Sequence, residues 1–224
     1  MSLFNTLAFL VFPYIALTVF VVGHTYRYFT DEVTWNARSS EFLDKESLKY
    51  PIIIFHWGII FTLLGHAGGM LIPQRVFDAV GISGEAHTEL AVYSGFFIGL
   101  AALVGSVLLV RRRMTRERIK IHTSVNDWIT IGGLVFVIAV GMYNVVFGHY
   151  YVLDTVAPWI RSILIFAPKP ELMTEVPPSY KLHILSALAL IGFSPFTRLV
   201  HIWSVPLGYL NRRYILFRRR AAGC

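Results

Sequence analysis

Histidine is the residue type whose placement in this sequence points to chemistry. The chain has eight histidines, and His56, His66 and His183 lie inside long stretches that contain no charged residue. A fourth, His201, lies near the end of the last apolar stretch. A polar side chain in lipid is costly unless it has a partner. A hydrogen bond to a neighbouring helix explains any one of these histidines, but it explains four on two segments less well.

The four histidines pair by depth if the two segments that carry them are antiparallel helices. His56 then lies at the same membrane face as His201, and His66 at the same face as His183. Neutral imidazole is a good iron ligand and adds no charge to the membrane. Two haems, each with two axial histidines, require this arrangement.

The spacing within the two segments is unequal. His56 and His66 are ten residues apart, about 15 Å along a helix, whereas His183 and His201 are eighteen apart, about 27 Å. Straight helices cannot make both pairs level. Pro195 lies between the second two histidines, and we expect it to bend that helix.

Stretches without charged residues predict the helices that position these histidines. Five stretches lack Asp, Glu, Lys and Arg, and about 20 apolar residues suffice to cross a bilayer. They predict an all-α integral membrane protein, one membrane domain over 1–224. Its five transmembrane helices are expected at 3–25, 51–72, 90–110, 128–148 and 180–203, followed by a basic tail, 204–224. The first is expected to remain as a mature helix, because no basic residue precedes Arg27.

Basic residues predict the orientation. Fifteen Lys and Arg residues fall in segments 26–49 and 111–127 and in the tail, against three in 73–89 and 149–179. Basic loops stay in the cytoplasm, so the N-terminus is expected outside and the C-terminus inside. The longest outer loop is expected to contain a short helix that begins at Pro158 and lies on the membrane surface, with Trp159, Ile163 and Phe166 on one face.

Composition excludes several classes of protein. Hydrophobic residues make up 55% of the 224, charged residues only 15%, and the mean hydropathy is +0.60. A soluble enzyme, a disordered chain and a nucleic-acid-binding module do not fit these values, even at a net charge of +7. The single cysteine, Cys224, leaves no internal disulfide, no four-cysteine zinc site and no Fe–S cluster held by this chain alone.

Small residues accompany the histidines. Gly58, Thr62, Gly65 and Gly69 form a stripe at helical spacing, and Gly95 and Gly99 form a G-x-x-x-G pair. Clearance for a planar cofactor and close helix packing explain such stripes equally well.

The other four histidines lie outside the apolar stretches or at their ends, and one of them, His149, is expected to end the fourth helix on the outer side. His87 is expected in the short outer loop, close to the place where His66 emerges, and it could exchange protons with a substrate there. His24 and His122 are expected to be solvated or interfacial.

With these residues in view, the sequence resembles the gamma subunit of membrane-bound respiratory nitrate reductase, a di-haem cytochrome b that oxidises quinol. Three segments carry the resemblance: FHWGIIFTLLGHAGGMLIP (55–73), KLHILSALALIGFSPFTRLVHIWSVP (181–206) and YRYFTDEVTWNARSSEFL (26–43). The histidine spacing and the RLVHIWSVP motif are specific, whereas five helices alone are not.

The resemblance implies roles for individual residues. His56 and His201 would ligate the inner haem b, and His66 and His183 the outer one. A quinol site would lie beside the outer haem, near Gly65 and Gly69. One branch of the family has a lysine at the quinol, and here the matching place is His87.

The resemblance also implies a reaction and partners. Menaquinol or ubiquinol would be oxidised near the outer face of the bacterial or archaeal cytoplasmic membrane. Electrons would pass through both haems to an Fe–S (beta) subunit and a molybdenum (alpha) subunit that reduces nitrate. One alternative is a related cytochrome b subunit of another quinone-linked reductase, of the sulfur-metabolism type. A more distant alternative is a transporter or an anchor without haem.

Overall fold

The computed structural model describes residues 3–31, 35, 42–148 and 150–204. Helices make up most of these residues, and no strand occurs among them, which confirms the all-α prediction. Most of the tail, from residue 205 onward, and His149 lie outside the described residues.

Four helices in the described part of the chain are long and apolar enough to cross a membrane. The first runs from Leu3 to Thr30 and comprises α1 (Leu3–Thr6), a π-helical turn η1 (Leu7–Val11) and α2 (Phe12–Thr30). The others are α3 (Lys49–His66) with the π-helical turn η2 (Ala67–Leu71), α5 (Gly84–Thr115) and α7 (Val125–Phe147).

Two of these helices are clearly longer than predicted. The first, expected over 3–25, ends five residues later, at Thr30. The helix expected over 90–110 begins six residues earlier, at Gly84, and ends five residues later, at Thr115. The Ser83 side chain caps it, because Oγ accepts a hydrogen bond of 3.2 Å from the Ala86 N–H. Absence of charge therefore marked only the central part of this helix.

The fifth segment is only partly the helix that was expected over 180–203. Helix α9 (Pro178–Phe193) has 16 residues, and two 3₁₀ turns follow it, η4 (Ser194–Phe196) and η5 (Arg198–Ile202). Pro195 was expected to bend a continuous helix, but the α-helix ends two residues before it. Proline has no N–H to donate and its ring clashes with the carbonyl four residues earlier, so the helix cannot continue through it unchanged.

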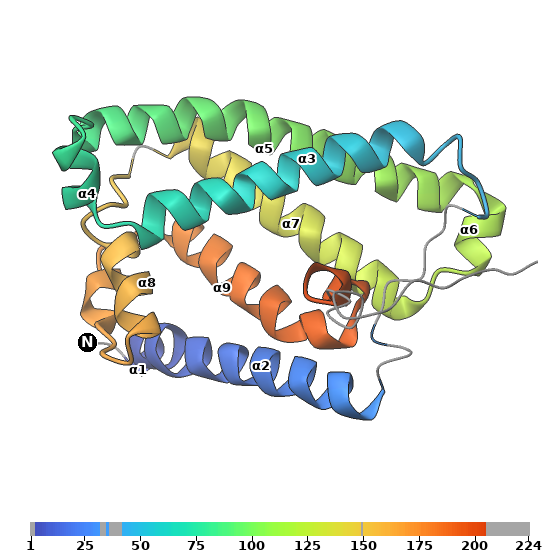
Figure 1. Cartoon of the computed structure of the whole chain (residues 1–224), viewed down its shortest axis with the longest axis horizontal. Helices are drawn as coiled ribbons and strands as arrows, with labels where there is room; N and C mark the ends of the chain where they lie inside the picture. The colour runs from blue at the N-terminus through green and yellow to red at the C-terminus, as the bar shows by residue number, and fades with distance from the viewer. Residues whose placement is uncertain (1–2, 32–34, 36–41, 149, 205–224) are drawn as a thin grey trace, which may run out of the picture.

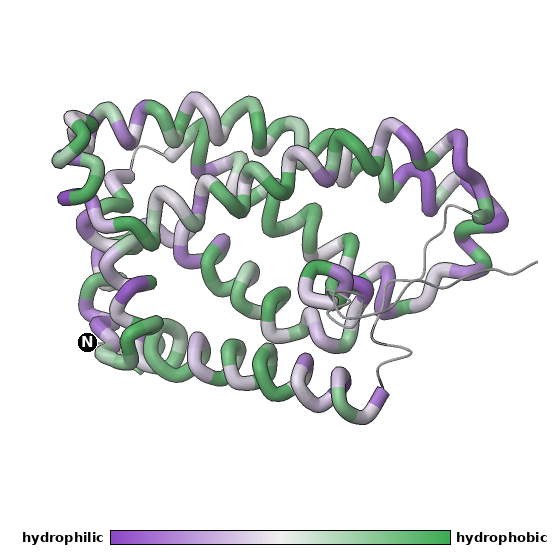
Figure 2. Tube along the Cα trace, viewed as in Figure 1, coloured by the Kyte–Doolittle hydropathy of each residue, from purple (hydrophilic) through white to green (hydrophobic). Residues whose placement is uncertain are grey.

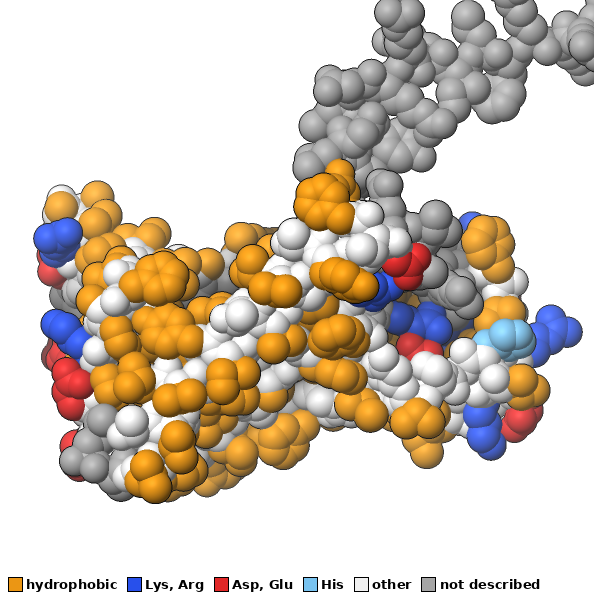
Figure 3. Space-filling model, turned by 90° about the horizontal axis from the view of Figure 1, so that it is seen from below, with side chains coloured by type: hydrophobic (Ala, Val, Ile, Leu, Met, Phe, Trp, Pro, Cys, Tyr) orange, Lys and Arg blue, Asp and Glu red, His pale blue; other side chains and the backbone are white. Residues whose placement is uncertain are grey.

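Short helices lie at the two ends of the bundle (Figure 1). Helices α4 (Gln74–Ala79) and α8 (Val156–Leu164) and the 3₁₀ turn η3 (Pro170–Met173) lie at one end, called the α8 end. Helix α6 (Glu117–Ile121) lies at the opposite end, called the α6 end. Hydrophilic residues gather at both ends (Figure 2), and Figure 3 shows hydrophobic side chains covering much of the face between them.

The long helices pack in the order α3, α5, α7, α9, α2. Contact between α3 and α5 is close because glycines lie at it. A Cβ on Gly58 would lie 2.5 Å from the backbone nitrogen of Ala102, and one on Gly105 would lie 2.5 Å from that of Phe55. Gly58 therefore serves helix packing, one of the two roles left open for the glycine stripe.

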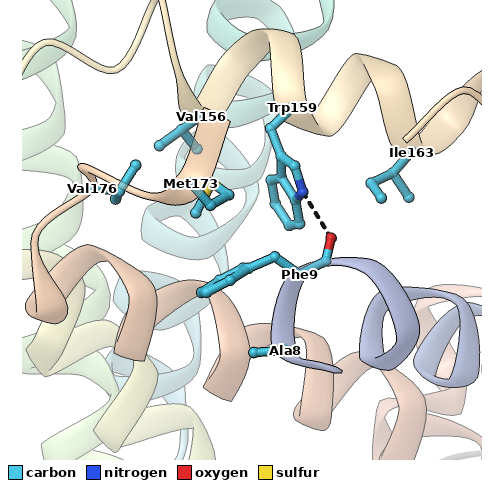
Figure 4. Close-up of a cluster of buried hydrophobic side chains, with 7 residues drawn as sticks. All are labelled: Ala8, Phe9, Val156, Trp159, Ile163, Met173 and Val176. Atoms are coloured by element: carbon cyan, nitrogen blue, oxygen red, sulfur yellow. Dashed lines mark hydrogen bonds between the residues drawn. The ribbon is translucent and has the colours of Figure 1, made fainter. Parts of the chain in front are cut away.

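The α8 end contains a buried apolar cluster (Figure 4). Its members come from three parts of the chain: Ala8, Phe9, Val156, Trp159, Ile163, Met173 and Val176. The short helix expected from Pro158 begins at Val156, and its apolar face packs inside the protein. Trp159 and Ile163 are buried against the first helix, and only Phe166, just beyond α8, is 81% exposed.

Candidate metal centres

The structure brings the four histidines together in the two predicted pairs. The rings of His66 on α3 and His183 on α9 have centroids 6.1 Å apart and planes tilted by 34°. The rings of His56 on α3 and His201 on η5 have centroids 6.0 Å apart and planes tilted by 57°. One pair therefore lies towards the α8 end and the other towards the α6 end.

In all four histidines, Nδ1 lies within hydrogen-bonding distance of a backbone carbonyl. The acceptors are Ile52 for His56 (2.8 Å), Thr62 for His66 (2.7 Å), Val137 for His183 (3.0 Å) and Arg198 for His201 (2.6 Å). A carbonyl only accepts, so Nδ1 carries the proton and donates. In the neutral ring Nε2 then has the free lone pair, the protonation state that metal-binding histidines adopt.

The distance between the rings tests whether a metal ion fits between them. Two imidazoles on opposite sides of one ion, with bonds of about 2.1 Å, have ring centres about 6.4 Å apart. A direct N–H···N hydrogen bond of about 3 Å would bring them to about 5.2 Å. The observed 6.0 and 6.1 Å are closer to the first value. Both pairs therefore fit a shared metal ion better than a direct hydrogen bond.

The donor set limits what kind of metal group each pair could hold. Within the described ranges, no group of three or more His, Cys, Asp or Glu side chains could hold a metal ion. Protein ligands alone complete a zinc site with four donors. Two histidines suffice only when another group supplies the remaining ligands, as the porphyrin of a haem does.

A glycine that sequence reasoning missed supports His183. A Cβ on Gly141 of α7 would lie 2.8 Å from Cε1 and 3.2 Å from Nδ1 of His183. The imidazole therefore rests on bare backbone, which also places Nδ1 near the Val137 carbonyl. Gly65, one turn before Gly69 on the same helix, has no atom within 4 Å of its ideal Cβ position, so its role is not packing against a described neighbour.

The end of α9 resolves the unequal spacing of the histidines. From His183 to Phe193, where α9 ends, is ten residues, the same number as from His56 to His66. Beyond that point the chain no longer advances as an α-helix, and His201 lies on η5 beside His56. The eighteen-residue separation therefore does not correspond to 27 Å of helix.

The first helix holds this break in place. His24 Nε2 lies 3.2 Å from the Ser194 hydroxyl, and Arg27 Nη1 donates a 2.6 Å hydrogen bond to the Pro195 carbonyl. Trp35 Nε1 donates to His24 Nδ1 over 3.1 Å. His24 was expected to be solvated or interfacial, and it is not solvated, because its ring is buried and hydrogen-bonded on both nitrogens.

Helix α7 holds the second 3₁₀ turn through a buried carboxylate. Asp127, only 6% exposed, pairs with Arg198 through two hydrogen bonds, Nε to Oδ1 and Nη2 to Oδ2, the latter of 2.9 Å. Arg113 lies 3.9 Å from the same carboxylate. Because the Arg198 carbonyl accepts from His201 Nδ1, the ion pair fixes the residue that orients His201.

His87 lies beside the α8-end pair, but not in a loop as expected. It occupies the first turn of α5 and is 6% exposed. Its ring lies 4.2 Å from that of Phe77, and a Cβ on Gly69 would be 3.4 Å from its Nε2. Nδ1 lies 2.8 Å from Gln74 Oε1. Gly69 and His87 are therefore neighbours, while Gln74 and Phe77 were not singled out in the sequence.

Two other groups predicted from the sequence are structural or solvated. Gly99 packs on Met142 of α7, since its Cβ would lie 2.5 Å from Sδ. His122 is exposed, as expected, and its Nδ1 contacts the Arg118 carbonyl over 2.8 Å. The contact to a carbonyl four residues back is therefore not specific to the paired histidines. Their specific feature is the facing ring.

The long apolar helices in the described part of the chain are those of a multi-pass membrane protein. The nitrate reductase gamma subunit family model matches residues 5–220. The chain belongs to this family, which confirms the resemblance found in the sequence.

Two nitrate reductase gamma chains align with nearly the whole length of this chain. The chain is 39% identical to the nitrate reductase gamma chain of Bacillus subtilis, over 94% of this chain and 96% of the relative. It is 32% identical to the respiratory nitrate reductase 1 gamma chain of Escherichia coli, over 98% and 100%. A more distant match, 20% identical over 70% of this chain and 56% of the relative, is to one subunit of the dihydromethanophenazine:CoB–CoM heterodisulfide reductase of Methanosarcina mazei.

Proposed function

We propose that this chain is the membrane subunit of a respiratory nitrate reductase complex and that it oxidises quinol with two b-type haems. The observation that carries the proposal is the pair of facing imidazoles at each end of the bundle, 6.0 and 6.1 Å between ring centroids, with every Nδ1 on a carbonyl. Family membership supports the same conclusion.

The chain crosses the membrane five times in this proposal. Helix α9 covers about 24 Å of the roughly 30 Å hydrocarbon core, and the two 3₁₀ turns complete the crossing. The α6 end faces the cytoplasm, because the segments 26–49 and 111–127 and the tail hold fifteen basic residues. The α8 end faces outward, the N-terminus lies outside and the C-terminus inside the cytoplasmic membrane.

His66 and His183 hold the outer haem through Nε2, and His56 and His201 hold the inner one. A haem iron bound there supplies one-electron chemistry, so two in series connect the outer leaflet with the inner face. The protein fixes each imidazole through its Nδ1 carbonyl contact, which selects the tautomer and raises the basicity of the ligand. Gly141 and the Asp127–Arg198 pair fix His183 and His201 respectively.

Quinol is oxidised beside the outer pair. Gly65 leaves open space on α3, and Gly69 brings the backbone close to His87. His87 accepts one quinol proton and passes it to the outside. Protons released outside while electrons move inward separate charge, and each elementary charge is worth about 2.3 kcal/mol per 100 mV.

The electrons leave at the inner face to partner subunits. This chain has one cysteine and no Fe–S or molybdenum ligand set, so an Fe–S (beta) subunit and a molybdenum (alpha) subunit must carry the later steps to nitrate. The basic tail is the proposed docking segment; apart from Ser204 it lies outside the described residues. The sequence identity is higher to the two nitrate reductase gamma chains than to the heterodisulfide reductase subunit. This difference favours nitrate as the final electron acceptor.

A reduced-minus-oxidised visible spectrum with haem quantification tests the proposal. The purified complex should contain two b-type haems per chain, both reduced by quinol and reoxidised by nitrate. A chain with no haem, or with haems that quinol does not reduce, would contradict it. Reoxidation by a sulfur compound instead of nitrate would assign the chain to the alternative reductase.

A further inference from the structure

Gln74 makes a set of hydrogen bonds that only one orientation of its amide allows. Its Nε2 lies 2.9 Å from Asp78 Oδ1 and 3.0 Å from the Ile82 carbonyl oxygen. Both of these atoms accept hydrogen bonds, so the NH₂ group must face them. The flipped amide would place Oε1 against two oxygens. The amide oxygen therefore faces the third neighbour, His87.

The orientation of the amide fixes the tautomer of His87. Oε1 of Gln74 lies 2.8 Å from His87 Nδ1 and can only accept. Nδ1 therefore carries the proton, and in the neutral ring Nε2 has the lone pair. This nitrogen faces the backbone of Gly69, where a Cβ would come within 3.4 Å of it. The lone pair of His87 Nε2 is thus directed towards Gly69, three residues after His66.

The rest of the His87 environment prevents the ring from reorienting. The Phe77 ring has its centroid 4.2 Å from that of His87 and its plane tilted by 36°, and His87 is 6% exposed. Its backbone N–H donates to the Ser83 carbonyl over 2.8 Å, which anchors the first turn of α5. Helix α4 therefore delivers both Gln74 and Phe77 to one imidazole.

We infer that Gln74 is a positioning residue that holds His87 in the Nδ1–H tautomer, so that Nε2 accepts a proton from quinol. The inference rests on the function proposed above. A quinol hydroxyl breaks its O–H bond as Nε2 forms an N–H bond, which leaves an imidazolium. The two electrons of the quinol go one at a time to ferric haem, and the second proton goes to water. In the other tautomer Nε2 would carry a hydrogen and could not accept one.

Nitrogen NMR of the ring, combined with quinol kinetics, tests this on the full complex. With ¹⁵N-labelled histidine, His87 is assigned as the signal that is lost in His87→Ala. The parent should show protonated Nδ1 and bare Nε2. Gln74→Leu removes the acceptor, so protonated Nε2 should appear, and quinol-driven haem reduction should slow by about tenfold, the worth of one hydrogen bond.

Two variants serve as matched controls. For every variant, a content of two bound haems per chain verifies that the protein folds. Gln74→Glu combined with Asp78→Asn keeps an acceptor for Nδ1 and restores a donor between positions 74 and 78, so it should keep the parent tautomer. Asp78→Ala removes one partner of the amide but leaves the Ile82 carbonyl, so the tautomer should not change.

The outcomes separate this inference from the proposed function. Protonated Nε2 in the parent, or an unchanged tautomer and rate in Gln74→Leu, would overturn the role of Gln74. If His87→Ala slows quinol oxidation but Gln74→Leu does not, only the inference fails. If His87→Ala also oxidises quinol at the parent rate, then the role proposed for His87 fails, and the inference fails with it.

Discussion

The backbone carbonyl of Phe9 accepts a hydrogen bond of 3.0 Å from the indole Nε1 of Trp159, 150 positions along the chain. Within an α-helix that carbonyl would bond to the N–H of residue 13, but Pro13 has none. The π-helical turn Leu7–Val11 ends two residues before the proline. A helix defect thus provides the attachment point for α8 (Figure 4).

Trp159→Phe should therefore destabilise the α8 end. It leaves a buried carbonyl without a donor, which costs about 1–3 kcal/mol, and thermal unfolding of the purified protein measures the loss. Pro13→Ala restores an N–H to the first helix, so the double variant should lose less than the two single variants together. Strict additivity would show that the two sites are not coupled through Phe9.

Gly141→Ala should displace His183, because the added Cβ would lie 2.8 Å from its Cε1. We expect the outer haem to be lost or its midpoint potential to shift, while the inner haem is unchanged. Gly132→Ala on the same helix is the matched control, since nothing lies within 4 Å of its ideal Cβ. Optical redox titration distinguishes the two. An outer haem that is normal in Gly141→Ala would show that α7 does not support His183.

Asp127→Asn should weaken the inner haem selectively. The change removes the charge that fixes Arg198, whose carbonyl orients His201. Removing one partner of a fully buried ion pair lowers the free energy of unfolding by about 3–5 kcal/mol. A smaller loss is expected here because Arg198 is partly exposed. The control is Asp44→Asn, whose 3.4 Å pair with Arg116 is more exposed and should matter little. Equal loss of both haems in Asp127→Asn would indicate general unfolding instead.

His87→Ala should slow haem reduction by quinol by about 10- to 100-fold, since proton transfer to a positioned base contributes at least that much. Haem content should not change, and a dye that feeds electrons directly to the partner subunits should still support nitrate reduction. His122→Ala, an exposed histidine with a similar carbonyl contact, should behave as the parent. Parent rates in His87→Ala between about pH 5.5 and 8 would exclude His87 as the proton acceptor.

Much of this arrangement could be predicted from the sequence. Stretches without charge marked the centres of the long helices, and antiparallel order alone paired His56 with His201 and His66 with His183. Helix ends were less predictable. The cap by Ser83 places His87 inside α5, and a serine with an acidic residue two positions later, Glu85, is a signal that could have indicated it.

Other features depend on tertiary contacts that no local pattern contains. Pro195 is compatible with a bend or with a helix end, and it is His24 and Arg27 on the first helix that hold the observed end. Glycines are equally ambiguous. Gly58 packs helices, Gly65 faces open space, and Gly141 accommodates an imidazole, yet all three look alike in the sequence.

The central claim is that each pair of facing histidines holds one haem, and single substitutions with haem quantification test it most directly. His66→Ala and His183→Ala should each lose the outer haem and keep the inner one. His56→Ala and His201→Ala should each lose the inner haem and keep the outer one, with His122→Ala retaining both. Loss of different haems in His66→Ala and His183→Ala, or both haems retained in either, would contradict the pairing.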